Sequence, residues 1–299
     1  MKTTLLGNMH FVLIIALSSL LVSCRPDNSL NEASDHVPPF SKIVVVIGEN
    51  TKASTVIGNI TDAPYINSLG QSGASFISSF AIEHPSQPNY LDLFSGSHQG
   101  MTNNNAPSAH FTSPNLAREL FNAGKIFADY SEDLPYTGCD DTLSGLYVRR
   151  HNPVANWTGP GKNQVPFSFN QPFSEMPSNY FLLPDVCFVI PNLCNDGHDV
   201  CPPDSNRIKQ FDHWVQVHFS AYANWCVNHN SLLIVTYDED DWSGNNRIAT
   251  VFYGAHVKQG IYSETINHFT VLRTIEDAMS LTKHAGAAVY ERPIDFCWE

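Results

Sequence analysis

The stretch KIVVVIGEN, residues 42–50, decides the fold class. Residues 42–47 form a nearly continuous β-branched run, and such a run predicts a strand that is buried on both faces of a sheet. Similar apolar runs occupy residues 186–190, 232–237 and 248–253. Strands buried on both faces need covering elements above and below, so the sequence predicts a sheet enclosed by helices.

Helical patterns separate these runs, at residues 63–73, 89–94, 113–124, 207–227 and 269–279. In residues 113–124, Ser113 is predicted to cap the helix and Pro114 to take its first position. The alternation of strands and helices predicts one α/β sandwich around a mostly parallel sheet. Residues 140–178 are rich in Pro, Asn, Gly and aromatic side chains, and we interpret them as an insertion that covers one end of the sheet.

The composition favours a folded domain and argues against a nucleic-acid partner. The chain has 299 residues, of which 42% are hydrophobic and 15% charged, as expected for a chain with a substantial core. Its formal net charge is -13, whereas nucleic-acid binders present stripes of Lys and Arg. A small phosphate ester stays compatible with this charge, because a metal ion and a few donors can offset it within one pocket.

The N-terminal segment has the pattern of an export signal. Lys2 precedes an apolar run over residues 11–22, which is too short to span a bilayer as a helix. The run ends in LVSC, residues 21–24, which resembles a bacterial lipobox with Cys24 as the lipidation site. We therefore expect a signal peptide over residues 1–23, a tether over 24–38 and a catalytic domain over 39–299. The protein would be a cell-envelope lipoprotein that touches the membrane only through its anchor, and the alternative is an ordinary secretory signal.

Six of the seven cysteines follow Cys24, at positions 139, 187, 194, 201, 226 and 297. An even number in an exported protein predicts that most are paired in disulfides. Cys194 and Cys201 are the best candidates for one pair, because they close a short loop. The alternative is a zinc site, which the spacing disfavours because it lacks the C-x-x-C type.

Polar side chains follow three of the predicted strands. Glu49 and Asn50 follow the first, Asp238 and Glu239 follow the run that ends at residue 237, and NDGHD, residues 195–199, follows residue 190. Because active sites of open α/β sheets lie at the carboxyl ends of strands, these groups are expected to converge. Oxygen ligands of this kind suit a hard divalent cation, although an acidic run after a strand is more often a solvated turn.

The segment HPSQPNY, residues 84–90, places Ser86 just before a predicted helix. Free backbone N–H groups and the positive end of the helix dipole at such a position favour an anionic substrate. Ser86 is therefore a candidate nucleophile. The alternative is that its hydroxyl merely caps the helix.

Taken in order along the chain, several segments resemble the bacterial and fungal phosphoesterase family, which contains acid phosphatases and phospholipases C and belongs to the alkaline phosphatase superfamily. They are VVVIGEN (44–50), HPSQPNY (84–90), YSEDLP (130–135), RHNP (150–153), NDGHD (195–199), YDE (237–239) and His268 before LRTIE (272–276). The resemblance covers about residues 43–277. It implies a three-layer, alkaline phosphatase-like sandwich.

The resemblance also implies roles for individual residues. Glu49, Asn50, Asp238 and Glu239 match ligands of one divalent metal, for which Ca²⁺, Mg²⁺ or Mn²⁺ is expected. The family's acidic pair can be Asp-Asp, so Glu239 departs from that pattern. Ser86 matches the nucleophile that bridges metal and phosphorus. His151 and His198 match histidines that contact the phosphoryl oxygens, Asn89 is expected to donate to the same oxygens, and Asp196 to orient His198. For His268, a buried structural role is as compatible as a catalytic one.

The expected reaction is hydrolysis of a phosphate monoester through a phosphoseryl intermediate. Protonated histidines would favour an acidic optimum, since free His titrates near ~6.5. The first alternative is a phosphodiesterase of the phospholipase C type. It is disfavoured because the chain ends soon after the core that the family shares. The second is a surface lipoprotein that binds ligands without catalysis, which the intact set Glu49, Asn50, Ser86 and Asp238 disfavours. Residues 140–178 are expected to set substrate selectivity, and the sequence leaves the oligomeric state open.

Overall fold

A computed structural model describes Met1 and residues 37–203 and 205–299 of the chain. Apart from Met1, the predicted signal peptide lies outside the described residues, as do the candidate lipidation site Cys24 and the tether up to residue 36. Among the described residues, no helix is both long and apolar enough to cross a bilayer.

The strands and helices follow one another in an α/β order. The strands are β1 Lys42–Gly48, β2 Ala74–Phe80, β3 Phe127–Ser131, β4 Leu143–Ser144, β5 Tyr147–Val148, β6 Asn170–Pro172, β7 Val186–Ile190, β8 Ser231–Tyr237, β9 Arg247–Gly254, β10 Gly260–Tyr262 and β11 Ile266–Asn267. The α-helices are α1 Ala53–Val56, α2 Pro64–Ser72, α3 Ser86–Ser95, α4 Leu116–Asn122, α5 Arg207–Cys226 and α6 His268–Ala278.

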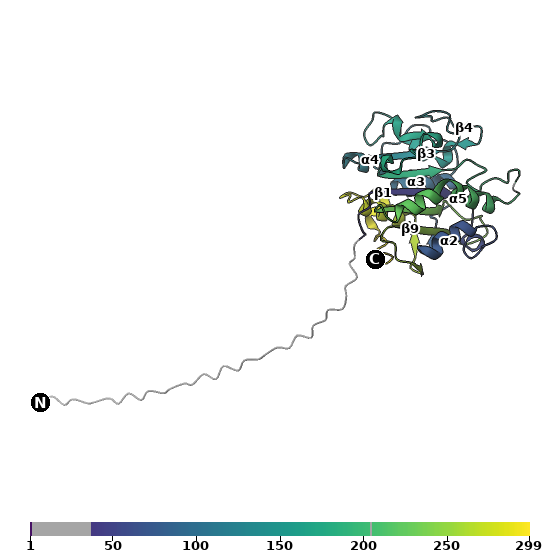
Figure 1. Ribbon diagram of the computed structural model, residues 1–299. Helices are drawn as coiled ribbons and strands as arrows, with labels where there is room; N and C mark the ends of the chain where they lie inside the picture. The colour runs from purple at the N-terminus through teal and green to yellow at the C-terminus, as the bar shows by residue number, and fades with distance from the viewer. Residues whose placement is uncertain (2–36, 204) are drawn as a thin grey trace. The chain divides into compact units, whose positions relative to one another are not determined.

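One sheet runs through the domain in the order β10-β2-β9-β8-β1-β7-β3-β6, and β11 pairs with β2. β9 is antiparallel to both of its neighbours, β2 and β8, while the other pairings in this sheet are parallel. β1 lies in the middle, between β7 and β8. The predicted α/β fold with a mostly parallel central sheet is confirmed (Figure 1).

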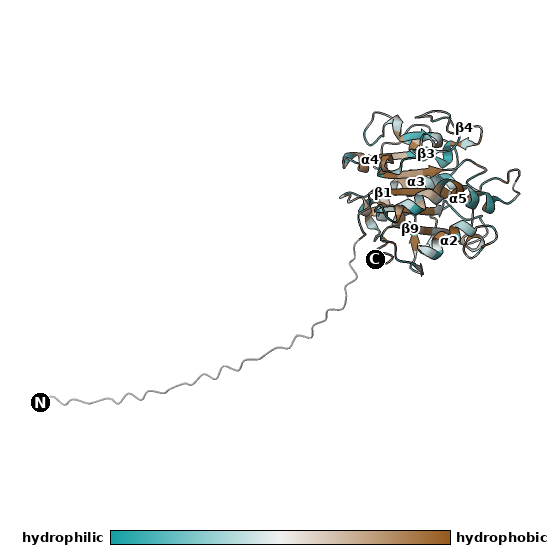
Figure 2. Ribbon diagram, in the orientation of Figure 1, coloured by the Kyte–Doolittle hydropathy of each residue, from teal (hydrophilic) through white to brown (hydrophobic). Residues whose placement is uncertain are grey.

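The alternation of side chains along β1 produces the three layers. Ile43, Val45 and Ile47 join one buried cluster with α3, α4 and α6, while Val44 and Val46 join a second cluster with α2 and α5. Successive side chains of a strand point to opposite faces, so one apolar run serves both clusters. Figure 2 shows the strands as the hydrophobic interior and the surrounding loops as mostly hydrophilic.

Two helix starts differ from the sequence prediction. α4 begins at Leu116, and the Asn115 side chain caps it by accepting a hydrogen bond from the Arg118 N–H at 2.9 Å. The predicted cap at Ser113 is therefore wrong, and Pro114 lies outside the helix. α3 begins at Ser86 rather than at residue 89, so Ser86 is its first residue.

The predicted insertion over residues 140–178 contributes mainly short 3₁₀-helices, the β4–β5 hairpin and β6. β6 extends the edge of the sheet by pairing in parallel with β3. Within the same segment, the 3₁₀-helix Arg149–His151 carries His151 to the end of the sheet where the polar side chains gather.

Candidate active site

The carboxyl ends of β1, β7 and β8 are joined by backbone hydrogen bonds. The Glu49 N–H donates to the Asp196 carbonyl at 2.8 Å, and the Asp238 N–H donates to the Gly48 carbonyl at 3.0 Å. These bonds bring the acidic residues that follow the three strands to one place. All three residues are almost completely buried, which is unusual for carboxylates.

Ser86 points into this group of carboxylates. Its Oγ lies 3.2 Å from Glu49 Oε2 and 3.1 Å from Glu239 Oε1. Pro85 occupies the N-cap of α3, and no side chain caps the helix. The Ser86 hydroxyl is therefore free of the capping role, and it sits at the positive end of a ten-residue helix.

The carboxylates lie so close together that their charges repel. Burial raises the pKa of Glu49 well above its usual range, and Asp238 and Asp196 add to the rise. Burial raises the pKa of Asp238 to about 7, with a contribution from Glu239, whose own pKa burial raises to about 7. Such a cluster is stable as a set of anions only beside a positive charge.

The free atoms of this cluster fit a cation. Within the described part of the chain, Glu49 Oε1 and Asp238 Oδ2 are buried and lack a hydrogen-bond partner. Glu49, His151 and His198 each offer one ligand atom, and these atoms lie within 4.8 Å of one another. The site is thus compatible with a metal, and its possible ligands include two histidine nitrogens besides the oxygens that the sequence predicted.

His151 lies at the centre of the site. Its Nδ1 is 3.2 Å from Asp196 Oδ2, and its Nε2 is 3.2 Å from Glu49 Oε1. Burial lowers the pKa of His151 well below its usual range, and Arg150 and His198 lower it further. Burial therefore favours the neutral form of this ring, whereas the acidic optimum expected from the sequence needs its protonated form.

His198 lies beside His151, with the two ring centroids 5.7 Å apart. Its Nδ1 is 2.7 Å from Asp199 Oδ1. Asp196 Oδ1 accepts a hydrogen bond from the His198 backbone N–H at 2.7 Å. Asp196 therefore fixes the backbone of His198 and the ring of His151, whereas Asp199 holds the ring of His198.

The two asparagines predicted at the site have different surroundings. Asn50 lies in the cluster, where its Nδ2 donates to Glu49 Oε2 at 3.0 Å and its backbone N–H donates to Asp238 Oδ1 at 2.9 Å. Asn89 is buried, and its Nδ2 donates to the Glu83 and Pro85 carbonyls at 2.7 and 3.3 Å. Both amide hydrogens of Asn89 are thus occupied, which leaves neither for the phosphoryl oxygens that the sequence analysis assigned to it.

His268 is the first residue of α6 and is buried against the end of β8. Its Nε2 donates to the Asp238 carbonyl at 2.6 Å, and burial lowers the pKa of its ring to about 4. A neutral ring in this position fixes the backbone that carries Asp238. This arrangement agrees with the alternative that His268 is a buried structural residue.

Two further residues of the site were part of the quoted motifs but received no role. His84 Nδ1 contacts Glu239 Oε2, and the His84 ring stacks on Trp242 with centroids 4.2 Å apart. Arg150 Nη2 lies 3.5 Å from His198 Nε2, where it adds a permanent positive charge. Their positions in HPSQPNY and RHNP were the available signal, because Arg150 directly precedes His151 and His84 stands two residues before Ser86.

The loop that carries Asp196 and His198 is closed by a disulfide between Cys194 and Cys201, as the sequence predicted. The expectation that most of the six cysteines are paired is wrong. Cys139, Cys187, Cys226 and Cys297 are free and buried. Each packs as a small apolar side chain, a common environment for free cysteine.

Comparisons with known proteins identify the family of the chain. A model of the phosphoesterase family matches residues 48–282. The chain is 44% identical over 289 residues to a Mycobacterium tuberculosis protein named phosphatidylinositol-3-phosphatase, and the match covers 96% of this chain and 92% of that protein. It is 29% identical over 225 residues to the phosphate-repressible acid phosphatase of Penicillium chrysogenum, covering 72% of this chain and 53% of the fungal one. The chain thus spans about half the length of the fungal relative.

A solved structure gives the same fold. A protein of the alkaline phosphatase superfamily from Vibrio parahaemolyticus superposes with a TM-score of 0.57 at 11% identity, covering 83% of this chain and 68% of that one. This likeness supports the alkaline phosphatase-like architecture alone. Because the family model spans most of the chain, the protein belongs to the phosphoesterase family and is a hydrolase of phosphoric esters.

Proposed function

We propose that the protein hydrolyses phosphate monoesters with Ser86 as the nucleophile. The observation that carries this proposal is the position of Ser86 Oγ, 3.2 Å from Glu49 Oε2 and 3.1 Å from Glu239 Oε1, at the N-terminus of α3. A hydroxyl between two buried carboxylates has an acceptor for its proton. The helix end beside it favours the phosphate dianion.

In the first half of the reaction, Ser86 Oγ forms a bond to phosphorus and its proton passes to Glu239. The bond from phosphorus to the leaving oxygen breaks, and the alkoxide takes a proton from His198, which Asp199 orients. Water then attacks the phosphoserine and gives a proton to the same ring, which releases phosphate. The proton on Glu239 returns to Ser86.

The residues present fit a divalent cation, with Glu49, Asn50 and Asp238 as the ligands we propose. Glu239, which the sequence also predicted as a ligand, is left free in this proposal to take the Ser86 proton. When bound, such an ion would lower the pKa of the Ser86 hydroxyl and offset the charge of the phosphoryl group. Arg150 and the N–H groups at the start of α3 supply further positive charge.

For the substrate we propose a phosphatidylinositol phosphate. The support is the relative from Mycobacterium tuberculosis, which matches 96% of this chain at 44% identity and is named phosphatidylinositol-3-phosphatase. Acid phosphatases, by name, are also among the relatives, so small phosphate monoesters serve as general test substrates.

The variant Ser86→Ala tests the nucleophile. We expect turnover of p-nitrophenyl phosphate to fall by about three orders of magnitude or more, as happens when covalent hydrolases lose their nucleophile. The melting temperature should change little, because the Ser86 hydroxyl caps nothing. The matched control is Ser95→Ala, a buried serine at the other end of α3 whose hydroxyl bonds the Leu91 carbonyl; it should keep its turnover. Near-normal turnover in Ser86→Ala would exclude this mechanism.

The same assay separates monoesterase from diesterase activity. A monoesterase cleaves p-nitrophenyl phosphate faster than p-nitrophenyl phosphorylcholine, because the dianion meets the positive groups at the start of α3 without a bulky second substituent. Faster cleavage of the diester would instead favour the phospholipase C type.

A further inference from the structure

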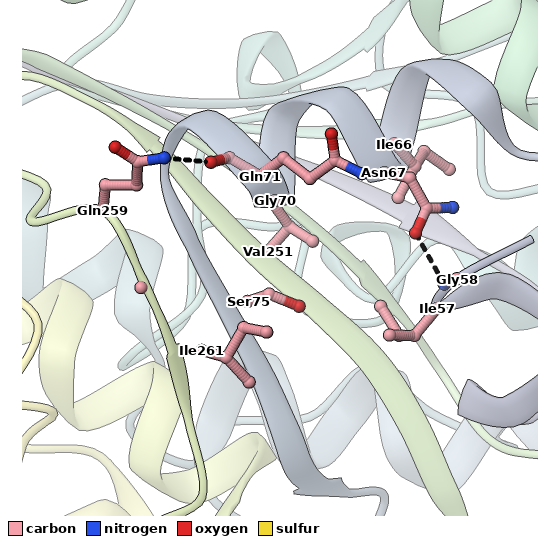
Figure 3. A pocket seen from close by; sticks show the side chains of 11 residues that line it. Ile57, Gly58, Ile66, Asn67, Gly70, Gln71, Ser75, Val251, Gln259 and Ile261 are labelled. Atoms are coloured by element: carbon pink, nitrogen blue, oxygen red, sulfur yellow. Dashed lines mark hydrogen bonds between the residues drawn. The ribbon is translucent and has the colours of Figure 1, made fainter. Parts of the chain in front are cut away.

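An apolar pocket of about 360 Å³ lies between α2 and the edge of the sheet formed by β9, β2 and β10. Figure 3 shows its apolar side chains around one space; they are Ile57, Ile66, Val251 and Ile261. The polar groups in its wall bond one another. Gln259 Nε2 donates to the Gln71 carbonyl at 2.7 Å, and the Gly58 N–H donates to Asn67 Oδ1 at 2.7 Å. The pocket therefore offers mainly apolar surface to a ligand.

A polar hollow of about 450 Å³ lies closer to the catalytic residues. Its lining includes Lys52, Ser54, Ser78, Asp240, Ser243 and Arg247. Lys52 Nζ lies 3.2 Å from Asp241 Oδ2, while Arg247 donates to the Ile77 carbonyl at 3.3 Å and forms no ion pair with a carboxylate of the described residues. Asp240 also lines the hollow, so Lys52 and Arg247 lie among carboxylates, and Arg247 is the cation that an anionic ligand could pair with.

The polar hollow begins beside Glu239. Asp240 directly follows Glu239, and Lys52 directly follows Thr51, whose N–H donates to the Glu239 carbonyl at 3.0 Å. The wall of the hollow is therefore attached to the same backbone that holds the carboxylates around Ser86.

The hollow and the pocket lie on the same face of the sheet. On β9, Arg247 lines the hollow and Val251 lines the pocket. Residues four apart in a strand share a face and lie about 13 Å apart. On β2, Ser75 lines the pocket and Ser78 the hollow. The register shift between Phe76 and Ser79 adds one residue to β2, and this returns Ser78 to the face of Ser75.

The third wall has the same order. Lys52 and Ser54 line the hollow, and Ile57 and Gly58, which follow them in the chain, line the pocket. β9, β2 and the segment 52–58 therefore each line the charged hollow beside the catalytic residues at one end and the apolar pocket at the other end. A ligand that lies along them meets charged and polar side chains first, Lys52 and Arg247 among them, and hydrocarbon side chains afterwards.

We propose that the polar hollow and the apolar pocket form one groove that binds the lipid part of the substrate. Lys52 and Arg247 contact the headgroup and its phosphodiester, and the apolar pocket takes one acyl chain. This order of groups is that of a phosphoinositide whose headgroup phosphate is at Ser86, so the inference rests on the proposed function. The volume of the pocket lies within the range of about 300–1,000 Å³ that is usual for small-molecule sites.

The first experiment compares substrates on the wild-type protein. Phosphatidylinositol 3-phosphate with two four-carbon chains is assayed against the eight-carbon homologue, both below their critical micelle concentrations, with p-nitrophenyl phosphate in parallel. Each methylene that becomes buried strengthens binding about fourfold, so we expect kcat/KM to rise more than tenfold with the longer chains. Equal values for the two lipids would overturn the acyl site. No cleavage of p-nitrophenyl phosphate would instead overturn the proposed function.

The second experiment uses Ile261→Asp. Ile261 is 74% exposed, so the variant is expected to fold, and its charge would face the acyl chain. We expect the ratio of kcat/KM between the eight-carbon and four-carbon lipids to fall to near one, mainly through KM. The matched control is Val217→Asp, on the exposed side of α5 and 59% exposed, which should keep the wild-type ratio. An unchanged ratio in Ile261→Asp would overturn the proposal.

Arg247→Gln tests the polar half of the groove. Because this variant removes a charge near the headgroup, we expect kcat/KM to fall about tenfold or more for both lipids and their ratio to stay at the wild-type value. A fall that is confined to the eight-carbon lipid would contradict the order of groups proposed here. The melting temperature of the variant shows whether the loss of the bond to Ile77 has disturbed the fold.

Discussion

The side chain of Asn89 determines the path of the backbone just before Ser86. Its Oδ1 accepts hydrogen bonds from the N–H groups of Ile82 and Glu83 at 3.0 and 3.1 Å, while its Nδ2 donates to two carbonyls of the same segment. One amide thus satisfies four backbone groups, two donors and two acceptors. The residue acts on Ser86 by holding the segment that leads into α3.

We therefore predict that Asn89→Ala destabilises the fold as well as lowering activity. Four partly buried backbone groups lose their partner, and the cost of leaving even one such group unpaired is about 1 kcal/mol, so the melting temperature should fall by several degrees. Turnover of p-nitrophenyl phosphate should fall with it, because Ser86 is held less firmly. The control is Asn228→Ala on an exposed position after α5. A rise in KM at an unchanged melting temperature would instead support the role of Asn89 as a donor to the phosphoryl group.

At the scale of elements, the sequence predicted the strands that are apolar throughout. The predicted ends of four strands lie within one residue of the observed ends; they are β1, β7, β8 and β9. Their apolar, β-branched runs are compatible with few structures other than a buried strand. β2 and β3 were missed because polar residues interrupt them. Those residues are buried in pairs: Ser79 bonds Thr250 at 2.8 Å, and Ser131 bonds Asp129 at 2.7 Å. Such pairing across or along strands depends on the register of the sheet, which one sequence does not give.

The loop between Cys194 and Cys201 is the element with the clearest test. The double variant Cys194→Ala/Cys201→Ala removes the constraint on a loop that holds Asp196 and His198. Closing a loop of this length stabilises a fold by about 2 kcal/mol, so the melting temperature should fall accordingly. We also expect kcat to fall, because His198 loses its fixed position. Dithiothreitol should lower kcat of the wild type to the same value and leave the variant unchanged; equal kcat in both proteins would show that the disulfide has no part in positioning His198.

At the scale of the whole molecule, the convergence of strand ends could be predicted, but the loop contacts could not. Glu49, Asp238 and Asp196 meet because parallel strands bring their carboxyl ends to one edge. The contacts of His84 and Arg150 depend instead on how two irregular segments fold onto that edge. The sequence shows that Asn89 lies three residues after Ser86, and this spacing suggested an amide free to bind the substrate. It does not show the backbone carbonyls to which that amide donates in the structure.

The carboxylate cluster lowers the free energy of unfolding of the whole domain when no cation is bound. Burial without a cation raises the pKa values of Glu49, Asp238 and Glu239, so the metal-free protein bears unfavourable charge at neutral pH. A cation that binds only the folded state stabilises it by about 2.7 kcal/mol at a hundredfold excess over its Kd. The melting temperature should therefore rise with Mg²⁺, Ca²⁺ or Mn²⁺ and fall with a chelator.

The variant Glu49→Gln sharpens this test, because it removes one buried charge and one proposed ligand together. Without metal, the variant should melt at the temperature of the wild type or above it, since its amide needs no counter-ion. With metal, the melting temperature of the variant should rise little, so the wild type becomes the protein with the higher melting temperature. Glu175→Gln, at an exposed position, should follow the wild type in both conditions. A metal-dependent rise of the same size in Glu49→Gln would place the cation elsewhere and exclude Glu49 as a ligand. Calorimetry at neutral pH measures the difference without any need for turnover.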